Sequence, residues 1–203
     1  MRIPAIATLL ILAALAAAAD EPAAIAPAEV ERTVAAMFRN APAELQPRLL
    51  QDETQQLCSQ FHDDPPEDVA EQITATERSA ITYPADGTLL GDWRRGAGIA
   101  EAGGGGQFSD DPGKPNGGNC YACHEMATAE VAYGTLGPSL KGYGRRRNFE
   151  AKAVRAAYAR IFDAQSVHAC SSMPRFGYHK FLTIEQIKDL TAYLMSPDSP
   201  VNN

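Results

Sequence analysis

The residues with the clearest chemical meaning form the run Cys120-Tyr121-Ala122-Cys123-His124. Cys-x-x-Cys-His is the attachment pattern of a c-type haem. The spacing has a mechanical reason, because two thiols three residues apart on one helical turn can reach the two vinyl groups of one porphyrin edge. The next residue then points its imidazole at the iron from the same side. We therefore predict one covalently attached haem, held by Cys120 and Cys123, with His124 as an axial ligand of the iron.

The same two cysteines are compatible with two other kinds of site. A structural zinc site needs four ligands, usually from two such pairs, and the other cysteines, Cys58 and Cys170, stand apart in the sequence. A thioredoxin-like redox site places its Cys-x-x-Cys in a βαβ context, and no strand-like alternation flanks this motif. The haem interpretation is therefore favoured over both.

A second axial ligand must come from elsewhere in the chain. The candidates are Met37, Met126, Met173, Met195, His62, His168 and His179. Met126 follows the first axial ligand too closely to reach the opposite face of the haem. Met173 lies in the irregular segment 171–177 and precedes a proline, which stiffens a loop that can lie across the haem. Thioether ligation suits a haem of high potential, so we predict Met173, with His168 and His179 as competitors.

The elements that must position these residues are expected to be helices. Three segments between residues 27 and 82 carry apolar side chains at helical intervals, with prolines at their breaks. These side chains are Val30, Val34, Met37 and Phe38, then Leu45, Leu49, Leu50, Leu57 and Phe61, and finally Val69 and Ile73. A further helix is expected at Thr88–Ala100, and a glycine-rich loop follows at 101–119. No segment alternates convincingly as a strand does, so we predict an all-α protein.

The last predicted helix has the sharpest boundaries. Thr183 and Gln186 stand at the spacing of a capping box, and Leu182 and Ile187 at that of a hydrophobic staple. Pro197 is expected to end the helix.

Composition and charge restrict the class of protein. The chain has 203 residues, 45% of them hydrophobic and 21% charged, which is ordinary for a globular protein. The formal charge of −7 argues against a nucleic-acid partner. Arg2, an apolar stretch and three alanines predict a cleaved signal peptide at residues 1–19, and no later apolar run is long enough to span a membrane. The protein is therefore expected in the periplasm, where disulfides form.

Two cysteines remain once the haem is attached. The remaining cysteines, Cys58 and Cys170, are two, an even number, and the protein is expected in an oxidising compartment. We therefore predict an intrachain disulfide between them. This bond would tie the N-terminal part of the chain to the loop that carries Met173. Two free thiols, or a bridge from either cysteine to another subunit, are the alternatives.

The order of several motifs resembles the class I cytochrome c pattern. They are Cys120 to His124, Gly137-Pro138-Ser139-Leu140, Gly144-Arg145, Met173-Pro174 and the final helix. Runs beside them are similar to the SoxX family, the monohaem subunits of the SoxAX complex of periplasmic thiosulfate oxidation. These runs are Tyr83 to Gly87, Gln107 to Asp110, Gly118 to His124 and Met173 to Gly177.

The resemblance implies a class I cytochrome c fold over residues 83–203, preceded by an N-terminal helical extension at 20–82. It implies that the Pro138 carbonyl accepts a hydrogen bond from the His124 nitrogen remote from the iron. Arg145 would lie near a haem propionate, although it also belongs to a basic run that would be solvated. Gly96 or Gly98 would permit a close crossing of the first and last cytochrome helices.

The resemblance also implies a function in electron transfer. The chain would accept electrons from the SoxA-catalysed oxidative conjugation of thiosulfate to a carrier-protein cysteine and pass them to a downstream acceptor cytochrome. It would form a heterodimer with a SoxA-like subunit, together an L-cysteine S-thiosulfotransferase, and would contribute no catalytic residue of its own. A cytochrome core needs about 100 residues, so the extension and the glycine-rich loop are expected to lie against the partner. An independent shuttle cytochrome c is the alternative.

Overall fold

The computed structural model describes residues 26–41, 43, 46–107, 109–111 and 113–203, and its regular structure in these ranges is entirely helical. The expected signal peptide at 1–19, and Leu45, lie outside the described residues. The chain forms two compact units, Met1–Leu50 and Gln51–Asn203. The segment 20–82, which the sequence suggests as one extension, is thus divided between the two units.

The first unit contains α1 (Pro27–Met37) and the 3₁₀ helix η1 (Gln46–Leu49). A proline at the start of α1 is favourable, because its fixed φ suits the first turn and its missing N–H would have no partner there. The apolar residues Val30, Met37 and Phe38 share this helix region as expected but remain largely exposed. No described helix is long and apolar enough to cross a membrane.

The second unit begins with α2 (Glu53–Gln60) and α3 (Glu67–Ser79). Asp52 begins α2 with a capping box: its Oδ1 accepts from the Gln55 N–H at 2.9 Å, and Gln55 Oε1 accepts from the Asp52 N–H at 3.0 Å. The spacing of apolar residues from Leu45 to Phe61 predicts one helical segment. The cap interrupts it, so η1 and α2 are separate elements.

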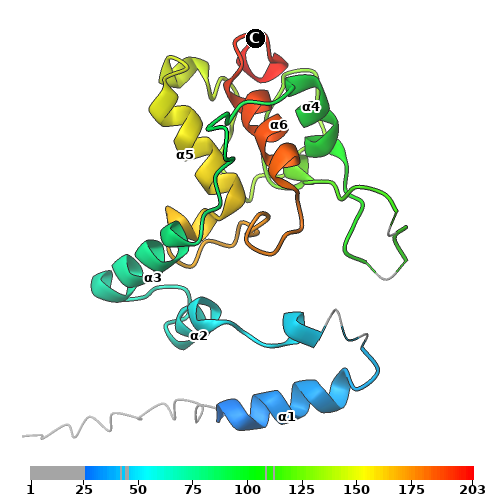
Figure 1. Cartoon of the computed structure of the whole chain (residues 1–203), viewed down its shortest axis with the longest axis vertical. Helices are drawn as coiled ribbons and strands as arrows, with labels where there is room; N and C mark the ends of the chain where they lie inside the picture. Colours follow the sequence, from blue (N-terminus) through cyan, green and yellow to red (C-terminus); the bar gives the residue numbers. More distant parts are fainter. Residues whose placement is uncertain (1–25, 42, 44–45, 108, 112) are drawn as a thin grey trace, which may run out of the picture. The chain divides into compact units, whose positions relative to one another are not determined.

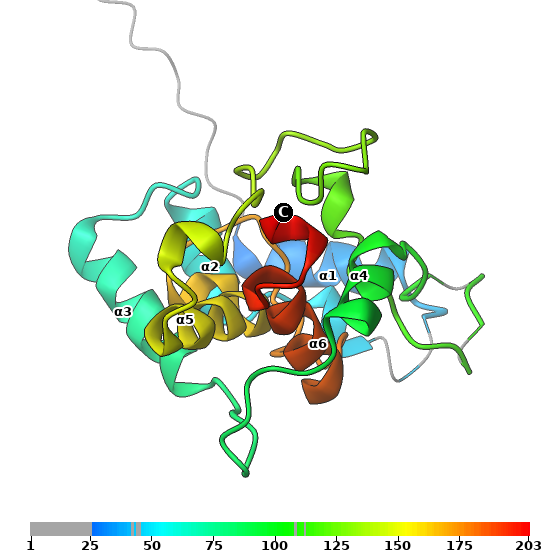
Figure 2. The same ribbon diagram turned by 90° about the horizontal axis from the view of Figure 1, so that it is seen from above.

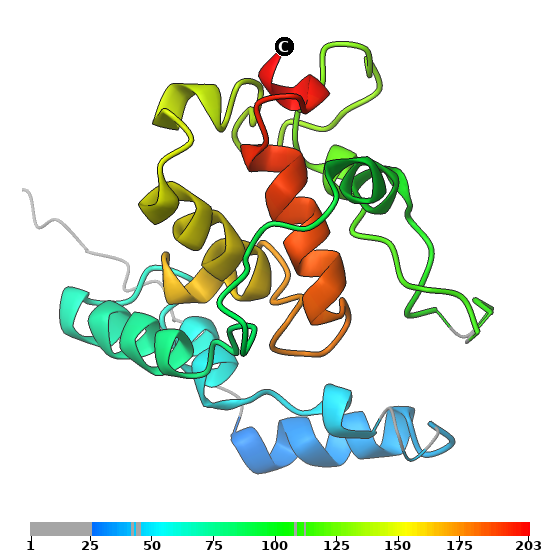
Figure 3. The same ribbon diagram turned by 45° about the horizontal axis from the view of Figure 1, so that its top comes forward.

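The core of the second unit is built on three helices, α4 (Trp93–Glu101), α5 (Ala151–Phe162) and α6 (Ile184–Met195). Figures 1 to 3 show α6 between the other two, and Figure 1 shows α3 below the C-terminal end of α5. Short 3₁₀ helices lie in the connections, namely η2 (Cys120–Ala122), η3 (Arg145–Arg147) and η4 (Ala164–Ser166), and a further one, η5 (Pro200–Asn202), follows α6. Tyr158 and Tyr193 are fully buried at the centre, together with Ile187 and Leu182. This is the all-α arrangement expected of a class I cytochrome c.

The boundaries of α6 agree with the sequence pattern, whereas those of α4 do not. Thr183 caps α6 in a capping box with Gln186, as predicted. α4 begins at Trp93 rather than at Thr88, because the Asp92 side chain accepts from the Arg94 N–H at 2.8 Å and so caps the helix there. α5 is not among the helices expected above, although apolar residues recur along it at helical spacing.

The glycine-rich loop begins at Ala102, after the end of α4, rather than at Glu101, and its described residues are anchored to the core. Asp110 Oδ2 accepts from the N–H groups of Gly105 and Gln107, both at 2.9 Å, and so closes the tip of the loop. Farther along, Asn116 Nδ2 donates to the Phe181 carbonyl at 2.8 Å, and Gln186 Nε2 donates to the Asn116 carbonyl at 2.7 Å. The loop is thereby fixed to the N-terminal end of α6.

The crossing of α4 and α6 depends on one of the two glycines that the sequence suggested. A Cβ on Gly96 would lie 2.1 Å from the Asp189 carbonyl oxygen, whereas a Cβ on Gly98 would meet nothing within 4 Å. The carboxylate of Asp189 also accepts hydrogen bonds from the Asp92 N–H at 2.7 Å and from Arg95 Nε and Nη2, each at 2.8 Å. Gly96 is therefore the residue that permits the close approach.

We predict opposite effects for alanine at these two positions. Gly96→Ala is expected to reduce the free energy of unfolding by about 1–3 kcal/mol, because the new methyl group overpacks the crossing. Gly98→Ala is expected to leave it unchanged or to raise it by up to about 1 kcal/mol, because alanine is the better helix former. Urea unfolding of both variants measures the difference, and equal effects would contradict this account of the crossing.

Candidate functional site

The Cys-x-x-Cys-His motif forms a single tight turn. Asn119 leads into it in the left-handed region, with φ of 46°. The carbonyl of Cys120 then accepts from the N–H groups of Cys123 at 3.1 Å and His124 at 2.9 Å. This turn is the local geometry that the three-residue spacing predicts.

The four described cysteines fall into two chemically different pairs. Cys58 and Cys170 form a disulfide, with their Cα atoms 5.3 Å apart, which confirms the predicted pairing. Cys120 and Cys123 are not part of a disulfide. Burial raises the pKa of the Cys120 thiol to about 12, whereas a nucleophilic redox cysteine needs a lowered pKa. The raised pKa of Cys120 therefore gives no support to a thiol–disulfide role for the motif.

The imidazole of His124 is held in one orientation. Its Nδ1–H donates to the Pro138 carbonyl at 2.7 Å, the hydrogen bond that the resemblance implied. The ring also packs against Gly137, where a Cβ would lie 2.1 Å from His124 Cε1. Such a bond fixes the tautomer and leaves Nε2 with its lone pair for a metal.

The candidates for a second axial ligand occupy different environments. Met126 and Met195 are each 1% exposed within the apolar core, where they fill space between helices. His168 and His179 are exposed. Met173 is half-buried against the core, in the irregular loop between η4 and α6.

Arg145 begins the 3₁₀ helix η3 and contacts the C-terminal segment. Its Nη1 donates to the Asn202 carbonyl at 2.9 Å, and its backbone N–H donates to Asn202 Oδ1 at 3.1 Å. The side chain is partly exposed, so this bond leaves other guanidinium N–H groups open to a further acceptor.

A buried group of charged residues behind the Met173 loop was not anticipated by the sequence patterns. Arg175 is 4% exposed and donates from Nη1 to Glu77 Oε1 at 2.9 Å and from Nη2 to Asp52. Asp163, which is fully buried, completes the group. These residues come from four separate parts of the chain, so no local motif could have indicated them.

Two carboxylate oxygens in this group, Glu77 Oε2 and Asp163 Oδ2, are buried without a hydrogen-bond donor among the described residues. Burial, followed by the interaction with Glu77, raises the pKa of Asp163 to about 8. At neutral pH Asp163 therefore keeps its proton, and that proton can be shared with Glu77. A single proton held between the two carboxyl groups would satisfy both oxygens.

This protonation predicts how stability depends on pH. An unfolded aspartic acid loses its proton near pH 4, whereas folded Asp163 retains it up to about pH 8. Its contribution to the free energy of unfolding is thus fully present below about pH 4 and is lost as the pH rises to about 8. We expect this decline to be shallower in Asp163→Asn than in the unmodified protein, as measured by urea unfolding at several pH values. Exposed Asp198→Asn is the control, and equal slopes in all three proteins would contradict the prediction.

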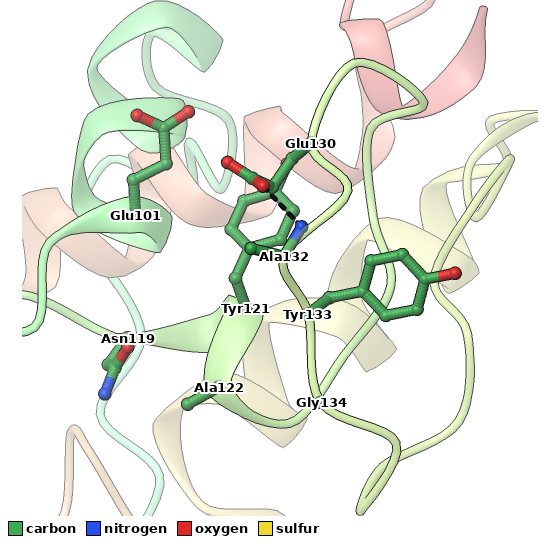
Figure 4. A pocket seen from close by; sticks show the side chains of 8 residues that line it. All are labelled: Glu101, Asn119, Tyr121, Ala122, Glu130, Ala132, Tyr133 and Gly134. Atoms are coloured by element: carbon green, nitrogen blue, oxygen red, sulfur yellow. Dashed lines mark hydrogen bonds between the residues drawn. The ribbon is translucent and has the colours of Figure 1, made fainter.

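A cavity of about 310 Å³ lies beside the motif, between α4 and the loop at 130–134 (Figure 4). Tyr121 lines it, and its hydroxyl is hydrogen-bonded to that of Tyr193 at 2.7 Å. The remaining lining residues are Glu101, Asn119, Ala122, Glu130, Ala132, Tyr133 and Gly134. Tyr121 and Ala122, which stand between the two cysteines, line this cavity, whereas Cys120, Cys123, His124 and Met173 do not.

Comparison with known proteins gives two findings. The model of the family described as cytochrome c matches residues 95–197. An uncharacterized lipoprotein of Aquifex aeolicus (strain VF5) is 42% identical over 157 residues, which are 75% of this chain and 73% of the relative. The family match begins within α4 and ends just after α6, so it covers the motif turn, the Met173 loop and the core helices.

Proposed function

Because this chain belongs to the cytochrome c family, as an electron-transfer haem protein, we propose that it is the monohaem, SoxX-type subunit of a thiosulfate-oxidising complex. The observation that carries the haem site is the contrast between the two cysteine pairs. Cys58 and Cys170 are joined to each other, while Cys120 and Cys123 are outside the disulfide and share one turn with His124, whose Nδ1 is already bonded.

The donor set fits one c-type haem. Cys120 and Cys123 would form the two thioether bonds, His124 would bind the iron through Nε2, and Met173 would bind from the other side. Thioether ligation of a haem raises its potential, and the haem would supply one-electron exchange. Arg145 would donate to a propionate with the N–H groups that Asn202 leaves free.

With His124 and Met173 both bound, the haem iron would have no vacant position for a substrate. The chain would therefore pass electrons rather than bind sulfur compounds. A SoxA-like subunit would join thiosulfate to the cysteine of a carrier protein, and the electrons released would pass through this chain to an acceptor cytochrome. The runs that resemble the SoxX family on both sides of the motif support this role.

The proposed location is the periplasm. The signal-like stretch at residues 1–19 supports export, and the relative's description as a lipoprotein is consistent with an exported protein. The disulfide between Cys58 and Cys170 supports an oxidising compartment.

The haem is tested on the purified protein by a pyridine haemochrome spectrum and by the Soret band after denaturation and reduction. We expect one haem for each chain and a Soret band that stays with the denatured polypeptide. The double variant Cys120→Ala/Cys123→Ala should carry no covalent haem. A Soret band that leaves the denatured chain would contradict covalent attachment.

The complex is tested by native purification followed by size-exclusion chromatography. A stable heterodimer with a second cytochrome supports the SoxX-type role, whereas a lone monomer supports the shuttle cytochrome. The proposed contribution of the extension to the partner interface is tested by deleting residues 20–50, because residues 51–82 hold Cys58 and the buried carboxylates of this chain's own core. Unchanged affinity for the partner would exclude an interface through residues 20–50.

A further inference from the structure

The loop that carries Met173 is tied down on both sides. Three residues before Met173, Cys170 forms the disulfide to α2. Two residues after it, Arg175 is buried and bonded to two carboxylates. Four residues, 171–174, remain between the two ties. A short anchored segment loses less conformational entropy than a long free loop when a side chain on it must stay in one place.

Both ties lead to the same part of the chain. The disulfide reaches Cys58 on α2, and Arg175 reaches Asp52, the N-cap of α2, and Glu77, on α3. Segment 51–79 therefore holds the loop from both directions, although it lies about a hundred residues earlier in the sequence.

The Arg175 guanidinium is itself held in place. It lies 4.2 Å from the centre of the Tyr178 ring. Its partner Glu77 also accepts a hydrogen bond from Thr54 Oγ1, so the carboxylate cannot turn away from the arginine without losing a second bond. The loop continues into a backbone contact, in which the Gly177 N–H donates to the Phe162 carbonyl at 2.9 Å.

Stability alone does not account for this arrangement. A buried ion pair is on average no more stabilising than well-packed apolar side chains of similar volume. Its bonds are directional, however, because the planar guanidinium presents its N–H groups in a fixed fork. An apolar contact would leave the loop free to slide, whereas this fork fixes its position and direction.

We propose that Arg175 is a positioning residue for the axial methionine, and that segment 51–79 is the frame to which it holds the Met173 loop. The proposal rests on the His124 and Met173 ligation proposed above. It gives this segment a role in iron ligation within the chain, separate from any contact with a partner subunit.

The test uses the full-length haem protein in the ferric state. Urea titration is followed by two signals, the weak red absorbance of the methionine–iron bond and the far-ultraviolet circular dichroism of the whole fold. In Arg175→Gln we expect the red band to disappear at a lower urea concentration than the circular dichroism signal. The equilibrium constant for methionine release at a fixed low urea concentration should rise at least about tenfold. Arg175→Lys, which keeps the charge but not the fork, should recover part of the difference.

Arg160→Gln is the matched control, since it makes the same charge change at an exposed position on α5. It should leave both transitions unchanged. If Arg175→Gln does not fold, the same titration is made on Glu77→Gln, because this variant removes one ion pair of Arg175 and can keep the hydrogen bond from Thr54. If the two transitions move together in the variant that folds, Arg175 serves the fold alone and the proposal is wrong. Met173→Ala tests the ligand assignment separately from the role of Arg175. If the red band survives this substitution, Met173 is not the ligand.

Discussion

Replacing Met173 with alanine is expected to abolish the weak red absorbance of the ferric protein while the haem stays attached through Cys120 and Cys123. The reduction potential should fall by more than about 100 mV, because axial ligands are a main determinant of haem potential and a thioether favours the reduced iron. The absorption spectrum and a potentiometric titration measure the two effects. Met173 is half-buried on its loop, so the loss of its side chain should change the free energy of unfolding only slightly. The main effect should be the loss of an axial ligand from the iron.

The competing ligands provide the controls for this experiment. His168 and His179 are exposed and lie on either side of Met173 in the sequence. Their alanine variants should have the spectrum and the potential of the unmodified protein. The assignment of Met173 would be wrong if its variant matched the unmodified protein while one of the histidine variants differed.

The second large effect is expected when the disulfide is removed. Cys58→Ser/Cys170→Ser should lower the free energy of unfolding by about 4–5 kcal/mol in the chain-entropy model, because the bond closes a loop across a sequence separation of 112 residues. The ferric red band should also be lost at a lower urea concentration, because the bond is one of the two ties on the Met173 loop. Urea unfolding followed by both signals measures these changes.

The bond is verified first by intact mass after alkylation without reduction. We expect no alkyl adduct on the native haem protein, because two cysteines are in the disulfide and the other two would be thioether-linked. Two adducts on the monomer would show that Cys58 and Cys170 are free. If no adduct forms and the double variant is as stable as the unmodified protein, the bond contributes little to the folded state and the predicted loss of about 4–5 kcal/mol is wrong.

Several features could be predicted from the sequence because their causes are local or chemical. The haem-attachment motif depends on five consecutive residues, and the capping box of α6 on four. The pairing of Cys58 with Cys170 followed from the number of remaining cysteines and the expected compartment. The bond from His124 to Pro138 came from the family resemblance, since nothing in the spacing of these residues requires it.

The tertiary structure decided what depends on residues distant in sequence. Gly96 and Gly98 are equivalent as helix-weakening residues, and only the position of Asp189 on α6 shows which one the crossing needs. Asp52, Glu77, Asp163 and Arg175 look like ordinary surface charges in the sequence. Glu77, Asp163 and Arg175 become buried, with Asp52 half-buried beside them, because α2, α3, the end of α5 and the Met173 loop converge. Burial removes water from charged groups, so their partners and the pKa of Asp163 depend on that convergence rather than on residue type.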